Sequence, residues 1–277
     1  VYPHHGAAIS EGKEKRVSVL LGGPETEVVL DAARDALKWV LVNENGAGHY
    51  RVAYPIPMLQ RLLYEGREYL SAGERYGLVQ DLRASVASGE LLLGEALALL
   101  PQLLNDSEPR VVSQAGMILD DAREFVPGSS KSNYEHYVRA ALAPILRDAG
   151  WRASSEESEK ARQLRLAMLG VMANHGEGRS LIEDARRRAV AWLADPNTLD
   201  PDTLEAVLSV AGRHCDRALL EQLLGKAKGP ANETDRWYLF TAMGSCRDPV
   251  LLNSTLTALA ARQFQPWDPV ALLEAAC

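Results

Sequence analysis

The most constraining feature of this sequence is a change of hydrophobic period near Pro55. Beyond that residue the apolar side chains recur at spacings of three and four, which is the period of an amphipathic helix. The gaps between the periodic segments are shorter than the segments, which is typical of helix pairs stacked side by side. The sequence therefore predicts a mainly α fold with helices over residues 58–70, 74–87, 91–104, 109–125, 132–148, 156–174, 179–194, 201–213, 217–227, 234–244 and 248–262.

Residues that begin or end helices lie at several of these boundaries. Ser71 and the pair Asp200-Pro201 are typical of helix starts, because Ser and Asp bond the free amides of a first turn and Pro presets its backbone. The sequence Pro127-Gly128 is typical of a helix end, and so is Gly229-Pro230.

An internal repeat supports stacked helix pairs. Residues 207–224 align without gaps on residues 239–256, at an offset of 32. In each copy the first helix would end at a glycine, and an aspartate would cap a second helix that buries a leucine pair. Such units cannot bury their apolar face alone and must stack, although any two helical hairpins could share this pattern. The matched positions are Gly212, Asp216, Leu219 and Leu220 with Gly244, Asp248, Leu251 and Leu252.

Before Pro55 the apolar residues alternate, which predicts short strands over residues 16–21, 26–30, 38–43 and 49–54. The last two strands flank a glycine-bearing loop and are expected to form a hairpin. These strands are few for an independent sheet domain, so we interpret residues 1–55 as the end of an incomplete β-sandwich. Residues 56–277 are then the helical domain.

Composition and charge exclude several classes of protein. The net charge of -7 argues against a nucleic-acid binder. The cluster of Arg186, Arg187 and Arg188 follows two acidic residues and is typical of a solvated helix face. No apolar run is long enough to span a membrane. The N-terminus lacks the features of a signal peptide and begins with Val, so we expect a piece of a longer protein.

The three cysteines, Cys215, Cys246 and Cys277, are odd in number and widely spaced. That pattern predicts no disulfide framework and favours a reducing compartment such as the cytoplasm.

The sequence holds no recognisable catalytic or metal-binding motif. The histidines show no two-ligand helical spacing, and neither Gly-x-Ser-x-Gly nor a phosphate-binding loop occurs. His214, Cys215 and Asp216 are consecutive, which leaves a thiol nucleophile open as an alternative. The repeat places Cys215 in a loop between helices, where a small structural residue is the favoured interpretation. We therefore expect no catalytic residue, metal ligand or cofactor in this chain.

Three segments resemble the zinc aminopeptidases of the aminopeptidase N type, which are gluzincins. "WVLVNENGAGHYRVAY", at residues 39–54, resembles the closing hairpin of their small β-sandwich, although His49 stands where the family usually has an aromatic residue. Residues 70–91 resemble the start of their C-terminal helical domain, and residues 235–252 a late helix pair with Arg236. The matching positions in the first two segments are Asn43, Gly46, Gly48, Tyr50, Arg51, Val52, Tyr54, Glu74, Arg75, Leu78, Asp81, Leu82 and Gly89.

The resemblance implies that this chain is similar to the C-terminal domain of endoplasmic reticulum aminopeptidase. The implied fold is a HEAT/armadillo-like α-superhelix of stacked helix pairs, preceded by a few strands from a partial β-sandwich. The family's Gly-x-Met-Glu-Asn and His-Glu-x-x-His motifs are not in this sequence. Zinc and catalysis would therefore belong to absent N-terminal and catalytic domains of the same polypeptide. This chain would cap the active site, enclose the cavity and help to bind peptide substrates.

Particular residues are candidates for these roles. Arg236 and Tyr238 are candidates for peptide binding by their position on the inner helix of a pair, and a structural ion pair is an equal alternative for Arg236. The alternatives are a free-standing helical-repeat adaptor and an enzyme with a site around Cys215. The strands argue against an adaptor, which needs no half sandwich. The residues expected to serve packing and interdomain contacts are Asn43, Gly48, Tyr50, Arg51, Tyr54, Arg75 and Asp81.

Overall fold

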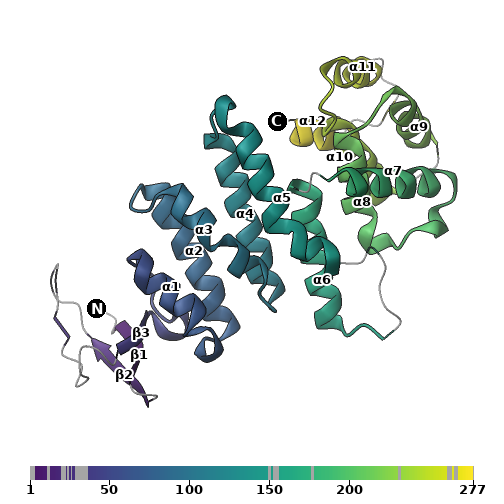
Figure 1. Ribbon diagram of the computed structural model, residues 1–277. Coiled ribbons are helices and arrows are strands. Elements are labelled where there is room, and N and C mark those ends of the chain that lie inside the picture. The colour runs from purple at the N-terminus through teal and green to yellow at the C-terminus, as the bar shows by residue number, and fades with distance from the viewer. Residues whose placement is uncertain are drawn as a thin grey trace. The chain divides into compact units, whose positions relative to one another are not determined.

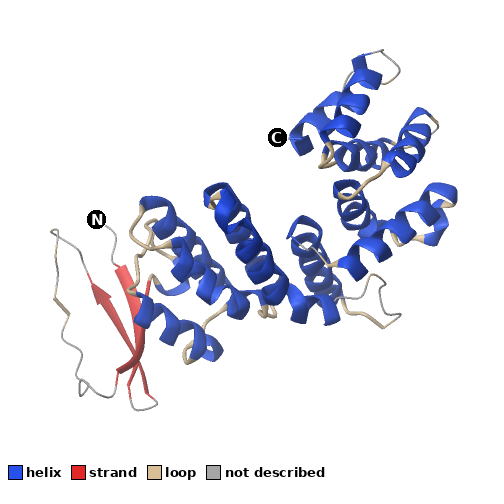
Figure 2. Cartoon of the chain, turned by 45° about the horizontal axis from the view of Figure 1, so that its top comes forward, coloured by secondary structure: helices blue, strands red, loops and turns tan. Residues whose placement is uncertain are grey.

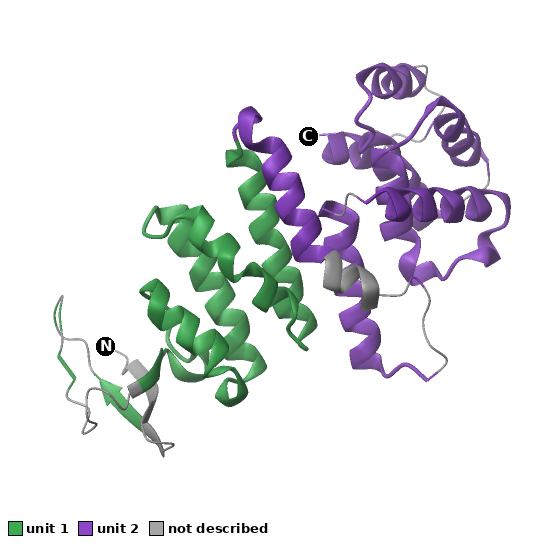
Figure 3. Ribbon diagram, viewed as in Figure 1, with its two compact units in different colours: residues 1–126 green, residues 127–277 purple. Residues whose placement is uncertain are grey.

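The computed structural model describes residues 4–10, 13–19, 23, 25, 27–28, 37–148, 151, 156–175, 178–229, 232–260, 264 and 268–276. These residues are mainly helical, as the sequence predicts (Figures 1 and 2). Within this part of the chain, no helix combines the length and the apolar composition that crossing a bilayer requires. The chain divides into two compact units, residues 1–126 and 127–277 (Figure 3).

The first unit begins with a small antiparallel sheet. Its strands are β1 (His4–Ser10), β2 (Lys13–Val19) and β3 (Leu37–Val42), in the order β2-β1-β3. In the central strand Ala7 lies opposite Arg16 of β2 and Leu41 of β3. Trp39 and Leu41 are buried while Lys38 is exposed, which is the alternation expected of a strand covered on one face.

The strand predictions are confirmed only in part. The prediction for residues 38–43 agrees with β3, and the prediction for residues 16–21 overlaps β2, whereas β1 was not predicted. The strand predicted over residues 49–54 is wrong, and so is its hairpin: residues 49–55 have no regular structure. Most of the strand predicted over residues 26–30 lies outside the described residues. Glu27 and Val28 are described and are not in a strand.

Helices complete the first unit: α1 (Ile56–Tyr64), α2 (Ala72–Ser88), α3 (Leu93–Leu104) and α4 (Pro109–Phe125). Ser71 caps α2 as expected, within a capping box completed by Glu74. α2 ends at Gly89, whose φ of 79° is in the left-handed region that glycine adopts without strain. α4 packs on both α2 and α3 and buries one apolar face. Leu62, Leu99, Leu100, Leu104, Ile118 and Leu119 are among the fully buried side chains.

The second unit contains α5 (Lys131–Asp148), α6 (Glu159–His175), α7 (Arg179–Ala194), α8 (Leu204–Arg213), α9 (Arg217–Lys228), α10 (Glu233–Gly244), α11 (Pro249–Ala260) and α12 (Asp268–Ala276). Short 3-10 turns start at Pro196 and Pro201, so α8 begins three residues after its predicted start at Pro201. α10 packs against both α8 and α12 and lies at the centre of a large apolar cluster. α12 was not predicted from the sequence.

The repeat predicted from the sequence has a clear structural basis. Asp216 caps α9 by accepting a hydrogen bond from Leu219 N, and Asp248 accepts one from Val250 N at the start of α11. The matched glycines lie where another helix approaches. A Cβ on Gly212 of α8 would lie 2.7 Å from the carbonyl carbon of Ala242 in α10. Because no side chain fits there, glycine sets how closely these helices pack.

Candidate functional site

Several residues that resemble the aminopeptidase motif form one connected cluster between β3 and α2: Asn43, Gly48, Tyr50, Arg51, Tyr54, Glu74 and Asp81. Asn43 follows β3 with φ of 64°, a left-handed conformation that Asn tolerates better than most residues. Its side-chain amide donates to Gly48 O at 3.0 Å, and its Oδ1 accepts from Gly48 N at 2.6 Å. A Cβ on Gly48 would collide with the ring of Tyr50, which explains the glycine there. Asn43 and Gly48 therefore close a tight loop.

Tyr54 fixes the far end of this loop to the end of β3. Its hydroxyl accepts a hydrogen bond from Val42 N at 2.8 Å and donates one to Val42 O at 3.1 Å. One side chain thus satisfies both backbone groups that a partner strand would otherwise bond. The side chain is buried, and this burial raises the pKa of Tyr54 far above its usual value.

Arg51 and Asp81 connect the loop to α2. Arg51 Nη1 lies 3.5 Å from Asp81 Oδ1 and donates to Gln80 Oε1 at 3.1 Å. Asp81 is only 8% exposed, and burial raises its pKa, although the Val52 backbone and Arg51 oppose the rise. Burial and the negative charge of Asp81 both raise the pKa of Tyr50. The ionisable groups of Arg51, Asp81 and Tyr50 therefore interact with one another.

Glu74 makes a second connection between the loop and α2. Its Oε1 accepts from Asn45 N at 2.9 Å, across 29 residues of sequence. Its Oε2 accepts from Ser71 N at 2.7 Å and from the Ser71 hydroxyl at 2.8 Å. The same carboxylate thus completes the start of α2 and holds the loop.

Arg75 joins the start of α2 to the α3–α4 connection. Its Nε and Nη2 donate to the two carboxylate oxygens of Asp106 at 2.9 and 3.2 Å, and Nη1 donates to Leu70 O at 2.7 Å. Asp106 is 4% exposed and also accepts from Glu108 N at 2.8 Å. Such a two-pronged pair is among the strongest that side chains form.

The roles of Asp106, Gln80 and Asn45 were not predicted from the sequence. Asp106 could have been recognised, because an aspartate three residues before Pro109, the first residue of a helix, is typical of a turn. Nothing in the local sequence around Asn45 or Gln80 marks them as partners of residues about thirty positions away. Their roles depend on the tertiary arrangement.

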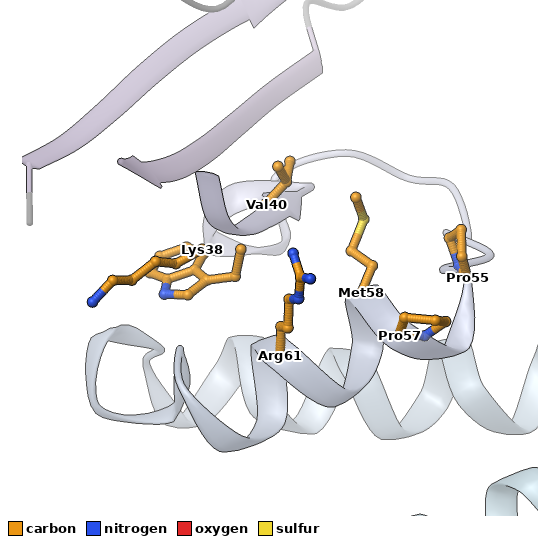
Figure 4. A pocket seen from close by; sticks show the side chains of 7 residues that line it. Lys38, Val40, Pro55, Pro57, Met58 and Arg61 are labelled. Atoms are coloured by element: carbon orange, nitrogen blue, oxygen red, sulfur yellow. The ribbon is translucent and has the colours of Figure 1, made fainter. Parts of the chain in front are cut away.

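A cavity of about 220 Å³ lies between β3 and α1 in the first unit (Figure 4). Met58 and Arg61 extend from α1 toward β3, where Val40 lies, and Pro55 and Pro57 line the other end. Trp39 completes the apolar wall, and Lys38 and Arg61 supply its two cationic groups. None of the described residues that line this cavity carries a hydroxyl, a thiol or a carboxylate.

Arg236 and Tyr238, the candidates for peptide binding, lie two residues apart on α10 and point toward different neighbours. Arg236 Nη1 donates to Ala227 O at 2.7 Å, and its guanidinium lies 6.0 Å from the centre of the Phe240 ring. Tyr238 is half-buried, and its pKa is raised first by burial and then by the Glu205 carboxylate. The structure thus gives each side chain intramolecular contacts and does not bring the two together.

The consecutive residues His214, Cys215 and Asp216 do not resemble a nucleophile site. Asp216 caps α9 and pairs with Arg186 at 2.8 Å. The Cys215 thiol is buried against Cys246, and burial raises its pKa, whereas a nucleophilic cysteine needs a lowered one. Among the residues described by the structure, no cluster of three or more His, Cys, Asp or Glu side chains could hold a metal.

Comparison with known proteins identifies the family. Residues 39–274 match the model of the ERAP1-like C-terminal domain. The chain belongs to this family. The motif cluster between β3 and α2 and both candidate residues of α10 lie inside the matched range of the ERAP1-like C-terminal domain.

Relatives of this ERAP1-like C-terminal domain are aminopeptidases. The chain is 27% identical to aminopeptidase M1-A of Oryza sativa subsp. japonica, over 85% of this chain and 28% of that protein. It is 24% identical to aminopeptidase M1 of Arabidopsis thaliana, over 86% of this chain and 28% of that protein. It is 22% identical to aminopeptidase 2 of Candida albicans, over 90% and 27%. The chain therefore spans little more than a quarter of the length of these relatives.

Proposed function

We propose that this chain is the non-catalytic C-terminal domain of a zinc-dependent aminopeptidase that removes N-terminal residues from peptides. The observation that carries the proposal is the family match over residues 39–274, supported by relatives named aminopeptidases. In this proposal the zinc and the catalytic groups belong to N-terminal and catalytic domains of the same polypeptide. The chain's own residues contribute binding surface and shape.

Its proposed role is to cap the active site, enclose the substrate cavity and help to bind the peptide. Layers of packed helices such as α8, α10 and α12 support this role, because they form a stiff wall. A wall that encloses a substrate excludes water and limits the peptide lengths that fit. Such a role requires few residues with special chemistry.

The proposed role of the motif cluster is to connect the sheet rigidly to the first helices. Arg51 pairs with Asp81 of α2, Tyr54 bonds the end of β3, and Glu74 of α2 bonds the loop at Asn45. A cap that opens and closes needs such a fixed connection, because a loose loop would uncouple the helices from the part of the protein that they cover.

The first test is a zinc determination and an aminopeptidase assay on this chain with aminoacyl-coumarin substrates. We expect neither bound zinc nor turnover. Stoichiometric zinc together with turnover would contradict the proposal, because it would require a site that this chain was not expected to contain. A series of fluorescent peptides of increasing length would then measure binding to the isolated chain by anisotropy.

A second test uses the polypeptide that contains the catalytic domain. Removing residues 56–277 should reduce the hydrolysis of long peptides far more than that of a single aminoacyl-coumarin, which does not reach beyond the catalytic centre. Equal losses for both substrates would contradict a role in peptide binding. A free-standing adaptor would leave both rates unchanged.

Variants of the candidate residues separate binding from packing. Tyr238→Phe keeps the packed ring and removes only the hydroxyl, while Arg217→Ala removes an exposed cation at the start of the neighbouring α9. If Tyr238 binds peptide, Tyr238→Phe weakens long-peptide affinity with little change in melting temperature, and Arg217→Ala leaves affinity unchanged. Unchanged affinity in Tyr238→Phe would remove Tyr238 from the candidates.

A further inference from the structure

Two cysteines of the second unit meet inside the apolar core, although they are 31 residues apart in sequence. Cys215 lies in the connection between α8 and α9, and Cys246 lies in the connection between α10 and α11. Their side chains are 9% and 5% exposed, and their Sγ atoms lie 2.7 Å apart. Neither is bonded to another cysteine in this structure.

The packing of the helices explains why these connections meet. Gly212 near the end of α8 lets the backbone of α10 approach at Ala242, so the two helices end side by side. A cysteine follows the end of each helix, and Asp216 and Asp248 then begin the next helices. The two thiols thus lie in matching connections of successive helix pairs but one position apart in the repeat, because Cys246 aligns with His214.

We propose that Cys215 and Cys246 are a redox pair that forms an intramolecular disulfide between the α8–α9 and α10–α11 connections. The distance between their sulfur atoms exceeds a disulfide bond length of roughly 2.05 Å by only about 0.65 Å. A small side-chain rotation closes that difference, whereas cysteines on unrelated surfaces would need the backbone to move. This inference is independent of the proposed peptidase role.

The proposed reaction is thiol–disulfide exchange with a small disulfide such as oxidised glutathione. The thiolate of one cysteine attacks a sulfur of the oxidant, after its proton leaves to solvent, and displaces one glutathione thiolate. The second cysteine loses its proton and attacks the mixed disulfide at the protein sulfur, and the second glutathione leaves. Two protein thiols are oxidised, and one small disulfide is reduced to two thiols.

Burial determines when this exchange occurs. Burial raises the pKa of the Cys215 thiol. The hydrogen bond with the Cys246 thiol and the negative charges of Asp216 and Asp248 raise it further. The reactive thiolate is therefore scarce in the folded chain, and access for a tripeptide is poor. The pair should exchange mainly while the chain folds or opens locally, and the finished bond should be shielded.

The first experiment refolds the chain from urea in glutathione redox buffers of defined composition. Cys277→Ser is used as the background, because it removes the remaining thiol and with it intermolecular disulfides. Rapid alkylation and mass spectrometry then count the protected cysteines. We expect a Cys215–Cys246 disulfide, with an effective concentration roughly 100-fold or more above that of the same pair in urea. Refolded protein with two free thiols, or with bound glutathione, at excess oxidised glutathione would overturn the proposal.

The second experiment compares melting temperatures of the oxidised and reduced forms of the same Cys277→Ser protein. A disulfide that closes a loop of this length should raise the melting temperature by about 10 °C. Adding Cys215→Ala or Cys246→Ala should abolish the rise, because one thiol alone cannot close the bond. Equal melting temperatures would overturn the proposal. The comparison of the two forms needs no core variant, so it decides even if the alanine variants fail to fold.

Discussion

Gly244 of α10 lies against the backbone of Leu272 in α12, such that a Cβ would be 3.0 Å from the Leu272 carbonyl carbon. Gly212 of α8 has the same relationship with Ala242 of α10, one repeat earlier in the chain. The two matched glycines of the sequence repeat are therefore the contact points of α8 with α10 and of α10 with α12. Their lack of a side chain determines the separation of those helices.

Replacing either glycine with alanine should destabilise the second unit. Gly212→Ala and Gly244→Ala each force a methyl group into a neighbouring backbone, where no flexible side chain can move aside. Overpacking of this kind costs about 1–3 kcal/mol or more. Urea denaturation followed by circular dichroism would measure the loss.

The matched control is Gly225→Ala in α9. A Cβ on Gly225 meets nothing within 4 Å, and alanine is a better helix former by about 1 kcal/mol. This variant should be as stable as the parent or more stable. A similar loss in all three variants would show that helix packing does not explain Gly212 and Gly244.

The sequence predicted most of the helices because their boundaries carry local signals. α4 begins at Pro109 and ends before Pro127, and its predicted range of 109–125 is confirmed at both ends. Asp216 and Asp248 cap helices as expected, since capping depends on residues only two or three positions away. α12 was missed because the short segment after residue 262 shows too few turns to establish a period.

The strand prediction for residues 49–54 failed because a side chain, and not the backbone of a neighbouring strand, bonds the end of β3. Residues 49–54 alternate like a strand, but Tyr54 bonds the end of β3 through its hydroxyl, and Arg51 pairs with Asp81. Periodicity cannot distinguish these roles from strand pairing. The contact between Cys215 and Cys246 could not be predicted from the sequence either, because it depends on how closely α8 and α10 pack. The motif residues around Asn43, Tyr54 and Asp81, by contrast, form one cluster in space.

Removing the Tyr54 hydroxyl should destabilise the first unit. Tyr54→Phe keeps the ring but leaves both backbone groups of Val42 without this partner, at a cost of about 1–3 kcal/mol. Hydrogen exchange at the Val42 amide should accelerate accordingly. Tyr64 is 58% exposed, so Tyr64→Phe is the control and should change neither quantity. Unchanged exchange at Val42 in Tyr54→Phe would contradict the structural role of the hydroxyl.

Breaking the pair between Arg75 and Asp106 should be more costly. Arg75→Ala leaves the buried Asp106 carboxylate without its main partner, and the loss should reach about 3–5 kcal/mol. Arg75→Lys should recover only part of it, because a lysine cannot make the two-pronged contact. The exposed pair of Arg179 and Glu183 is the comparison, and Arg179→Ala should cost less than about 0.5 kcal/mol. Thermal denaturation of Arg75→Ala, Arg75→Lys and Arg179→Ala would measure the order of these losses in stability.

Asp216 should make stability depend on pH in the acidic range. The Leu219 amide, and then Arg186, lower the pKa of Asp216 in the folded chain. Its contribution is therefore complete above the ordinary pKa of about 3.9 and is lost as the pH falls toward the lowered value. Asp216→Asn keeps an acceptor for the amide but has no charge to lose. The difference in unfolding free energy between parent and variant should shrink as the pH falls, from about 1 kcal/mol at most, because the group is exposed.

Asp81 is the control for this titration, because its pKa is shifted in the direction opposite to that of Asp216. Burial raises its folded pKa, so its favourable contribution is present at low pH and is lost as the pH rises through that raised value. The difference between parent and Asp81→Asn should therefore decrease as the pH rises. If both differences changed in the same direction with pH, the assignment of either shift would be contradicted.

The two oxygens of Glu74 make the first turn of α2 and the loop at Asn45 open and close as one event. Oε2 is bonded to Ser71 and Oε1 to Asn45, so fraying of the helix start withdraws the acceptor that holds the loop. The backbone amides of Asn45 and Ser71, 26 positions apart in sequence, should then report one shared opening equilibrium. Local opening of the helix start is therefore transmitted to the loop through the Glu74 carboxylate, and the apolar core does not have to open.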